Sequence, residues 1–208
     1  LLARGPFAVL TGAGLSTDSG IPDYRGPDPP PRTPMTYQQF TSDSAFRRTY
    51  WARNHVGWQH VHRTVPNEGH HALARMEARG LLTGVITQNV DRLHHRAGSR
   101  SVIDLHGTYA DIICLQCGTR STRDALAARL EELNPGFAEA VGRVADVEIA
   151  PDADAVIAAT EGFVVAACEV CGGMLKPDIV YFGESVPKER VARAFALVDE
   201  AAALLVAG

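Results

Sequence analysis

The fold is decided by one stretch, Pro6-Phe7-Ala8-Val9-Leu10-Thr11-Gly12-Ala13-Gly14-Leu15-Ser16-Thr17, which joins an apolar run to a glycine-rich turn. An apolar strand, such a turn and helix-capping Ser and Thr residues are typical of the first βα unit of a nucleotide-binding fold. The glycines permit close approach of the backbone, and free amides at a helix start suit phosphate oxygens. The next glycine, Gly20, comes too late for a full G-x-G-x-x-G, so a plain strand-turn-helix stays an open alternative.

Apolar segments alternate with helical ones along the rest of the chain. We expect strands at 81–87, 101–105, 178–182 and 203–208, and helices at 36–63, 70–79, 124–133 and 187–203. Apolar strands separated by helices predict an α/β fold with a parallel sheet. Because both ends of the chain are apolar strands, we also expect a domain that lacks its C-terminal portion.

Composition limits the classes of function. The 208 residues are 46% hydrophobic and 21% charged, which is ordinary for a globular protein with one core and a small inserted module. The net charge of −4 indicates no nucleic-acid surface, although a basic peptide would be acceptable as a partner. No apolar run approaches the roughly 20 residues that span a bilayer, so we expect no membrane partner.

The compartment is also suggested by composition. No charged and then apolar leader opens the chain, which gives secretion no support. The Ala- and Arg-rich composition suits a GC-rich bacterium, so we expect a cytoplasmic protein, or one of the mitochondrial matrix in a eukaryote. The oligomeric state is not readable from the sequence.

All four cysteines fall into two closely spaced pairs, Cys114-x-x-Cys117 and Cys168-x-x-Cys171, the second followed by Gly172-Gly173. Each pair can bind one metal ion from a tight turn, and four thiolates make a closed tetrahedral zinc site. A closed site is structural, because it leaves no coordination position for a substrate. Two disulfides or a redox dithiol are the alternatives, and zinc is favoured over both because every cysteine lies in a paired CxxC spacing and no secretion signal is present.

Three polar clusters follow the predicted strands, at 20–25, 87–94 and 106–107. Ligands of α/β sheets bind where strands end, so these clusters are candidate site residues. Each has a simpler explanation taken singly. Asp23 and Arg25 could form a surface pair, Gln88, Asn89 and Asp91 could cap a helix, and His106 could be structural.

Together with the cysteine pairs, these motifs resemble those of the sirtuin family over the whole chain. The matching segments are Gly12-Ala13-Gly14-Leu15-Ser16, Gly20-Ile21-Pro22-Asp23-Tyr24-Arg25, Thr87-Gln88-Asn89-Val90-Asp91, His106-Gly107, both cysteine pairs, and Leu175-Lys176-Pro177-Asp178-Ile179-Val180-Tyr181-Phe182-Gly183-Glu184. The resemblance implies a Rossmann-like NAD-binding lobe from 1–110 and 175–208, which includes a helical segment near 36–63. It also implies a zinc-binding lobe over 111–174.

The resemblance further implies NAD-dependent deacylation of lysine side chains in protein substrates, with release of nicotinamide and O-acyl-ADP-ribose. In such enzymes the acyl oxygen attacks C1′ of the nicotinamide ribose, and a base then removes a ribose proton. His106 would be that base, since an imidazole pKa near 6.5 suits the role, and Asn89 would be catalytic with it. The structural zinc takes no part.

The resemblance also assigns contacts to NAD and to the peptide. The implied NAD contacts are Gly12, Ala13, Gly14 and Thr17 at the pyrophosphate, Asp23, Tyr24 and Arg25 on a closing loop, and Gln88, Asn89, Val90 and Asp91 around the ribose and nicotinamide. An edge strand over 180–184, through Val180, Tyr181, Phe182 and Gly183, would pair with the acylated peptide. An ordinary buried strand fits these apolar residues equally well.

The acyl group is addressed by one further segment. Tyr50 and Arg53 lie three residues apart on a predicted helix, and a guanidinium beside a phenol suits a carboxylate at the end of an acyl chain. The surrounding stretch, 48–58, is similar to the mitochondrial sirtuin-4 type, or class II branch. Alternatively, Arg53 faces solvent or pairs with an acidic residue. Mono-ADP-ribosyl transfer and a non-catalytic NAD-binding role remain competing functions.

Overall fold

The computed structural model describes residues 5–23, 34–142 and 160–208, with the backbone alone at 59–62. It divides into two compact units. The first unit comprises Leu1–Pro30, Thr64–Thr108 and Ser185–Gly208, and the second comprises Pro31–Arg63 and Tyr109–Glu184. Each is described by itself.

The first unit is built on a four-stranded sheet with the order β3-β2-β1-β7. Its strands are β1 (Phe7–Thr11), β2 (Leu82–Thr87), β3 (Val102–Asp104) and β7 (Leu204–Ala207), and every neighbouring pair is parallel. The predicted parallel α/β sheet is therefore confirmed. Because the register pairs Thr11 with Thr87 and Thr87 with Asp104, the carboxyl ends of three strands reach the same edge.

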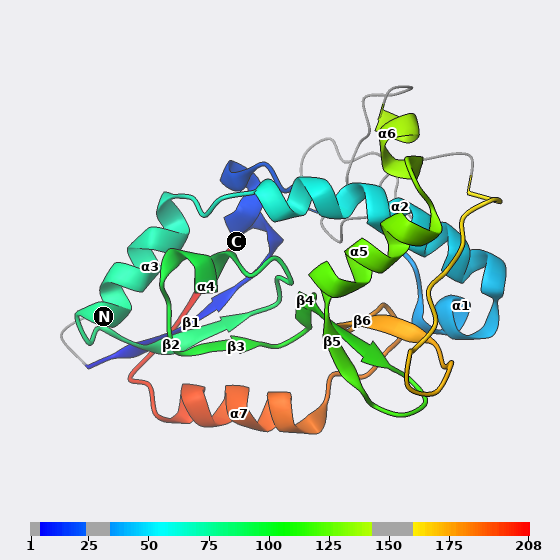
Figure 1. The fold of residues 1–208 in the computed structure, drawn as a ribbon. Helices are drawn as coiled ribbons and strands as arrows, with labels where there is room; N and C mark the ends of the chain where they lie inside the picture. Colours follow the sequence, from blue (N-terminus) through cyan, green and yellow to red (C-terminus); the bar gives the residue numbers. More distant parts are fainter. Residues whose placement is uncertain (1–4, 24–33, 143–159) are drawn as a thin grey trace. The chain divides into compact units, whose positions relative to one another are not determined.

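Helices cover both faces of this sheet. They are the 3₁₀ helix η2 (Ala13–Ser19), α3 (Glu68–Ala78), α4 (Leu93–Ala97) and α7 (Lys188–Asp199). Helices α3 and α7 pack on opposite faces (Figure 1). The central core joins Phe7 and Val9 of β1 to Leu82 and Val85 of β2 and to Leu73 of α3. The last predicted strand exists as β7 and lies at the edge of the sheet, where Val206 is 65% exposed.

The second unit contains a three-stranded sheet with the order β5-β4-β6 and four helices. Its elements are α1 (Tyr37–Ser42), α2 (Ser44–Arg63), β4 (Gly107–Cys114, which begins in the first unit), β5 (Arg120–Thr122), α5 (Arg123–Leu133), α6 (Phe137–Gly142) and β6 (Leu175–Ile179). The predicted helix over 36–63 is interrupted at Asp43, whose extended backbone ends α1. The Asp43 carboxylate then accepts hydrogen bonds from Ala45 N and Phe46 N at the start of α2.

The strand expected over 180–184 is wrong. Strand β6 ends at Ile179, and the chain then makes a turn in which Glu184 N donates to Tyr181 O over 3.0 Å. The Glu184 carboxylate accepts a hydrogen bond from Tyr181 N at 2.9 Å, and Gly183 supplies a positive φ of 78°. These local bonds compete with strand pairing, and Phe182 forms only an isolated parallel bridge with Thr36.

Aromatic packing explains why the helical segment at 36–63 falls into the second unit and not with the nucleotide-type sheet. The rings of Tyr50 and Tyr181 lie 5.4 Å apart, and Phe40 contacts both of them. The predicted boundaries, 1–110 with 175–208 and 111–174, therefore differ from these units, and the lobes as functional domains stay a prediction. None of the described helices has the length and apolar character that crossing a membrane requires.

Candidate functional site

The glycine-rich turn after β1 is tightly packed. A Cβ atom on Gly12 would lie 2.9 Å from the carbonyl oxygen of Gly208, and one on Gly14 would lie 3.1 Å from the Gly208 Cα. Both contacts are tighter than side chains normally accept, so glycine is needed here for the approach of the segment after β7. Thr17 is exposed, and its hydroxyl donates to the carbonyl oxygen of Gly14 at 2.9 Å.

Asn89 joins this turn to the segment after β2. Its Nδ2 donates to the carbonyl oxygen of Gly12 at 2.8 Å and to Ser16 Oγ at 3.1 Å. The Ser16 hydroxyl in turn donates to Asp91 Oδ2 at 2.7 Å. The structure thus brings together two motifs that are more than 70 residues apart in the chain. Buried Ser16 lies at their centre and joins the two motifs, whereas the glycine-rich motif taken alone indicated only a helix cap at this residue.

Asp91 also has the capping role that was left open as an alternative. Its Oδ1 accepts a hydrogen bond from Leu93 N at 2.8 Å, at the start of α4. The intervening residue, Arg92, has a φ of 64°, which no other non-glycine residue in the described part of the chain shares in sign. A left-handed arginine is strained by about 1–3 kcal/mol, and such strain gathers at functional sites. Capping and function are therefore compatible at this position.

His106 lies in the turn between β3 and β4, and its protonation pattern follows from one contact. Its Nδ1 is 3.1 Å from the carbonyl oxygen of Gln88, and a carbonyl oxygen can only accept, so Nδ1 carries the hydrogen. Nε2 is then left with a free lone pair. Burial lowers the pKa of His106, opposed by the hydrogen bond to Gln88, and the charge of Arg190 lowers it further. The ring is therefore neutral at pH 7, as a general base must be.

The remaining residues expected at NAD are placed as follows. Gln88 is exposed, and its backbone N donates to Thr11 O at 3.0 Å, which continues the pairing of β2 with β1. Val90 and Asp23 are half-buried. Tyr24 and Arg25 lie outside the described residues.

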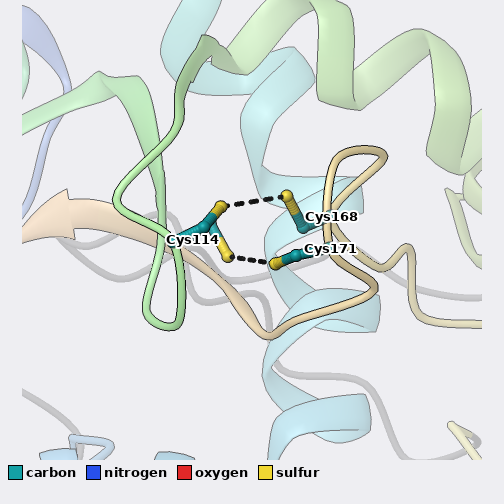
Figure 2. Close-up of side chains that lie close together, drawn as sticks. Cys114, Cys168 and Cys171 are labelled. Atoms are coloured by element: carbon teal, nitrogen blue, oxygen red, sulfur yellow. Dashed lines mark hydrogen bonds between the residues drawn. The ribbon is translucent and has the colours of Figure 1, made fainter.

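The four cysteines form a cluster in the second unit. All four sulfur atoms lie within 4.8 Å of one another, with 3.5 Å between Cys114 and Cys171 and 3.7 Å between Cys117 and Cys168 (Figure 2). A disulfide needs about 2.05 Å, so the alternative of two disulfides is wrong and all four thiols are free. Zinc with four sulfurs at about 2.3 Å would separate neighbouring sulfurs by about 3.8 Å. The cluster fits that ion.

The two cysteine pairs have the same backbone conformation. Gly118 N donates to Cys114 O at 2.9 Å, and Gly172 N donates to Cys168 O at 2.8 Å. These glycines have φ values of 72° and 71°, a region in which side chains are disfavoured. A glycine directly after the second cysteine of each pair is thus the signal of this turn. Only the second of these glycines was noted from the sequence.

The protonation of the cluster favours a cation. Thr119, whose Oγ1 lies 3.2 Å from Cys117 Sγ, lowers the pKa of Cys117 to about 6. The hydrogen bond with Cys117 raises the pKa of the neighbouring Cys171 thiol to about 12, opposed by the hydrogen bond with the Gly173 backbone. A divalent cation would release the remaining protons, because it binds thiolates and not thiols.

The residues expected to contact substrate also lie in the second unit. Tyr50 is buried, and Arg53 is half-buried one helical turn later. The carbonyl oxygen of Phe182 accepts from Tyr37 N at 2.9 Å and that of Gly183 accepts from Gln38 Nε2 at 3.3 Å, while the Phe182 ring is 53% exposed. Val180 is half-buried and Tyr181 is buried.

A buried cation near Tyr50 escaped the sequence analysis. The Arg123 side chain is inaccessible to solvent, and its Nη2 donates to Asn54 Oδ1 at 2.9 Å. Its guanidinium lies 5.0 Å from the ring centre of Trp58 and 5.8 Å from that of Trp51. No motif marks such an arginine, because its partners come from another helix 69 residues away.

Comparison with known proteins gives one consistent result. The chain is 64% identical over 208 residues to "NAD-dependent protein deacetylase 1" of Mycobacterium avium, which covers all of this chain and 74% of that protein. It is 47% identical over 210 residues to "NAD-dependent protein deacylase SIR4" of Monosiga brevicollis, covering 100% of this chain and 68% of that protein. A solved structure of a Sir2 mutant with a p53 peptide and NAD matches with a TM-score of 0.72 and 32% identity, over 99% of this chain and 71% of that one. The family model described as "Sir2 family" matches residues 12–208, and the chain therefore belongs to the Sir2 family, the sirtuins.

Proposed function

We propose that this protein is an NAD-dependent protein-lysine deacylase that releases nicotinamide and O-acyl-ADP-ribose. One observation carries the proposal. At the carboxyl edge of the parallel sheet, a neutral histidine with a free Nε2 lies beside a hydrogen-bonded group of Asn89, Ser16 and Asp91. The names of the relatives, which specify NAD-dependent deacetylation or deacylation, support the same reaction.

The residue types at this edge fit NAD. A carboxylate such as Asp91 accepts hydrogen bonds from a carboxamide NH₂ group. The NH₂ group of Asn89 donates to Gly12 and Ser16, and its Oδ1 can accept a hydrogen bond from a ribose hydroxyl. Ligands of parallel sheets bind at the carboxyl ends of the strands, where Thr11, Thr87 and Asp104 stand in register. We assign the NAD contacts to Gly12, Ala13, Gly14, Thr17, Asp23, Tyr24, Arg25, Gln88, Asn89, Val90 and Asp91.

In the reaction, bound NAD supplies a ribose carbon, C1′, that is open to attack by the acyl oxygen as nicotinamide departs. His106 Nε2 takes a proton from a ribose hydroxyl, while the Gln88 carbonyl oxygen holds the opposite ring nitrogen. Asn89 orients the ribose, because its own side chain is fixed by Gly12 and Ser16. A base of this kind typically contributes about 10²–10⁴-fold to the rate.

The substrate is an acylated lysine in a protein. We assign peptide contact to Val180–Gly183, where the Phe182 ring is exposed, and recognition of the acyl end to Tyr50 and Arg53. A carboxylate-ended or longer acyl chain would gain a charged hydrogen bond there. Membership of the class II branch is supported by the segment at 48–58 and by the likeness to the Monosiga deacylase. The Mycobacterium relative supports a bacterial source, and we propose a cytoplasmic location.

Zinc has a structural role in this proposal. Cys114, Cys117, Cys168 and Cys171 would hold one ion, which closes the base of the segment between the two cysteine pairs. Four sulfur ligands leave no open position, so no catalytic step involves the metal.

Nicotinamide release tests the proposal. The protein with NAD is offered lysine peptides that carry acetyl, glutaryl, hydroxymethylglutaryl, lipoyl or long-chain acyl groups, beside a His106→Tyr variant. Acyl-dependent release that the variant loses is expected, and the best peptide tests Tyr50 and Arg53. Nicotinamide release that needs no acyl peptide and labels protein with ADP-ribose would instead establish mono-ADP-ribosyl transfer.

A further inference from the structure

Behind Asn89 lies a chain of buried polar side chains that the reaction scheme does not use. We propose that His94 is a positioning residue, which fixes Asn89 through the hydroxyl groups of Thr11 and Thr87. The inference rests on the proposed function only for its kinetic consequence. The geometry itself concerns side chains of the first unit alone.

Three hydrogen bonds make up the chain. Asn89 N donates to Thr87 Oγ1 at 3.1 Å, and the Thr11 hydroxyl donates to the same oxygen at 2.8 Å. His94 Nε2 lies 2.9 Å from Thr11 Oγ1. The bond from Thr11 to Thr87 joins β1 to β2 and the bond between Thr11 and His94 joins β1 to α4, whereas the bond from Asn89 to Thr87 is local to the end of β2.

The tautomer of His94 follows from these bonds. The hydrogen of the Thr11 hydroxyl is directed to Thr87, so the Thr11 oxygen is left to accept a hydrogen bond from His94. His94 Nε2 must therefore carry a hydrogen, and the ring acts as a donor. Burial, followed by the charges of His70 and His95, lowers the pKa of His94, so the ring is neutral and keeps this single donor near pH 7.

Because its members are buried, this series of hydrogen bonds can adopt only one arrangement. Thr11 and His94 are each 1% exposed and Thr87 is 3% exposed, so water does not replace a lost partner without rearrangement. If His94 no longer donates, the Thr11 hydroxyl is free to turn away from Thr87. Thr87 then loses the partner that holds its oxygen toward Asn89 N. A small displacement of Asn89 is enough to affect a reaction that depends on orientation.

The kinetic test compares neighbouring histidines. His94→Leu removes the donor, His94→Gln restores an N–H near the position of Nε2, and His95→Gln is the matched control on the same helix. We expect His94→Leu to lower kcat by about tenfold with KM for the acyl peptide within about twofold. His94→Gln should regain most of kcat, and His95→Gln should leave it unchanged. A kcat that His94→Leu does not lower, or that falls equally in His95→Gln, would overturn the proposal.

A second measurement is independent of activity. Hydrogen exchange at the Asn89 amide is expected to be about tenfold faster or more in His94→Leu and in Thr11→Val, which preserves shape, but not in Thr11→Ser. Nitrogen-15 NMR of the His94 ring should show a hydrogen on Nε2. Unchanged hydrogen exchange at the Asn89 amide, or a hydrogen on His94 Nδ1 alone, would contradict the proposed series of hydrogen bonds. This outcome is readable even if the protein proves to have no deacylase activity. Thr11→Val also serves where His94→Leu does not fold.

Discussion

The two units stabilise their functional residues in opposite ways. The first unit buries neutral polar side chains that bond to one another, such as Thr11, Thr87 and His94, so its site is ordered by the protein alone. The second unit gathers four free thiols around a space that suits a cation. The difference teaches that the polar side chains of the first unit hold one another through hydrogen bonds, whereas we expect a metal ion to hold the four thiols of the second unit together.

The same contrast holds for buried charge. Neutral His94 of the first unit has lost its charge through burial, whereas Arg123 of the second unit stays charged, because burial lowers its pKa only to about 10. Two indole rings and the Asn54 carbonyl groups compensate that charge. One unit therefore avoids a buried charge, and the other surrounds it with aromatic rings and hydrogen-bond acceptors.

The largest expected effect is metal removal. Chelation, or Cys168→Ala, should unfold the cysteine-bearing part of the second unit, because structural zinc contributes on the order of 10 kcal/mol in small zinc domains. Hydrogen exchange should then rise throughout 109–142 and 160–184 while the β1 and β2 amides stay protected. Metal analysis should give one zinc per chain. If the amides of the second unit stay protected after complete loss of the metal, the proposed dependence of this unit on its metal is wrong.

Acid is expected to affect the first unit next most strongly. The pKa of His94 is about 4 in the folded state, below the 6.5 of an unperturbed ring, because of burial and the charges of His70 and His95, with Asp104 opposing. As the pH falls, His94 therefore binds a proton in the unfolded state at a higher pH than it does in the folded state. The stability contributed by the neutral ring is complete above pH 6.5 and is lost as the pH falls toward 4, by about 3 kcal/mol in all.

This pH dependence can be measured from the exchange of the slowest β1 and β2 amides between pH 7 and 4. Burial lowers the pKa of His70 too, so its contribution has the same sign. The slope should be shallower in His94→Gln, which cannot bind a proton, and should change much less in His95→Gln, which removes only a minor cause of the lowered His94 pKa and keeps the burial that is its main cause. If the dependence of stability on pH is the same in His94→Gln as in the unchanged protein, a titrating group other than His94 is responsible for it.

An intermediate effect is expected at the buried guanidinium. Arg123→Lys keeps the positive charge but loses the paired hydrogen bonds to Asn54 and the contact of the guanidinium with the two indole rings, which should cost about 2–3 kcal/mol. Arg75→Lys is the control, because Arg75 forms an exposed pair with Glu68 at 3.4 Å, of a kind worth about 0–1 kcal/mol. Urea unfolding measures both. Equal and small losses would show that Arg123 is not specifically held.

How much of this could be predicted from the sequence depends on whether a feature is local. The βα turn at Gly12, the cysteine pairs and the parallel sheet follow from short patterns, and the structure has them. The role of Ser16, the chain from His94 to Asn89 and the burial of Arg123 depend on partners more than 65 residues away. The edge strand that the resemblance implied over 180–184 does not form, because the Glu184 side chain accepts a local hydrogen bond from Tyr181 N.

The smallest effect is expected from adding one carbon atom to Gly173, where the two cysteine turns of the second unit meet. A Cβ on Gly173 would lie 2.9 Å from Gln116 Cβ and 2.5 Å from its Oε1, which accepts a hydrogen bond from Met174 N at 2.7 Å. Gly173→Ala should therefore displace Gln116 and weaken the contact between the two cysteine turns, by about 1–2 kcal/mol. Gly162→Ala is its control in the same unit, since nothing lies within 4 Å of the added carbon, and it should be neutral or slightly stabilising. Zinc release to a chelator should be faster in Gly173→Ala alone. Equal zinc release rates in Gly173→Ala and Gly162→Ala would mean that the metal, and not the contact between Gln116 and Gly173, holds the two turns together. The second unit would then depend on its ion even more than its packing suggests.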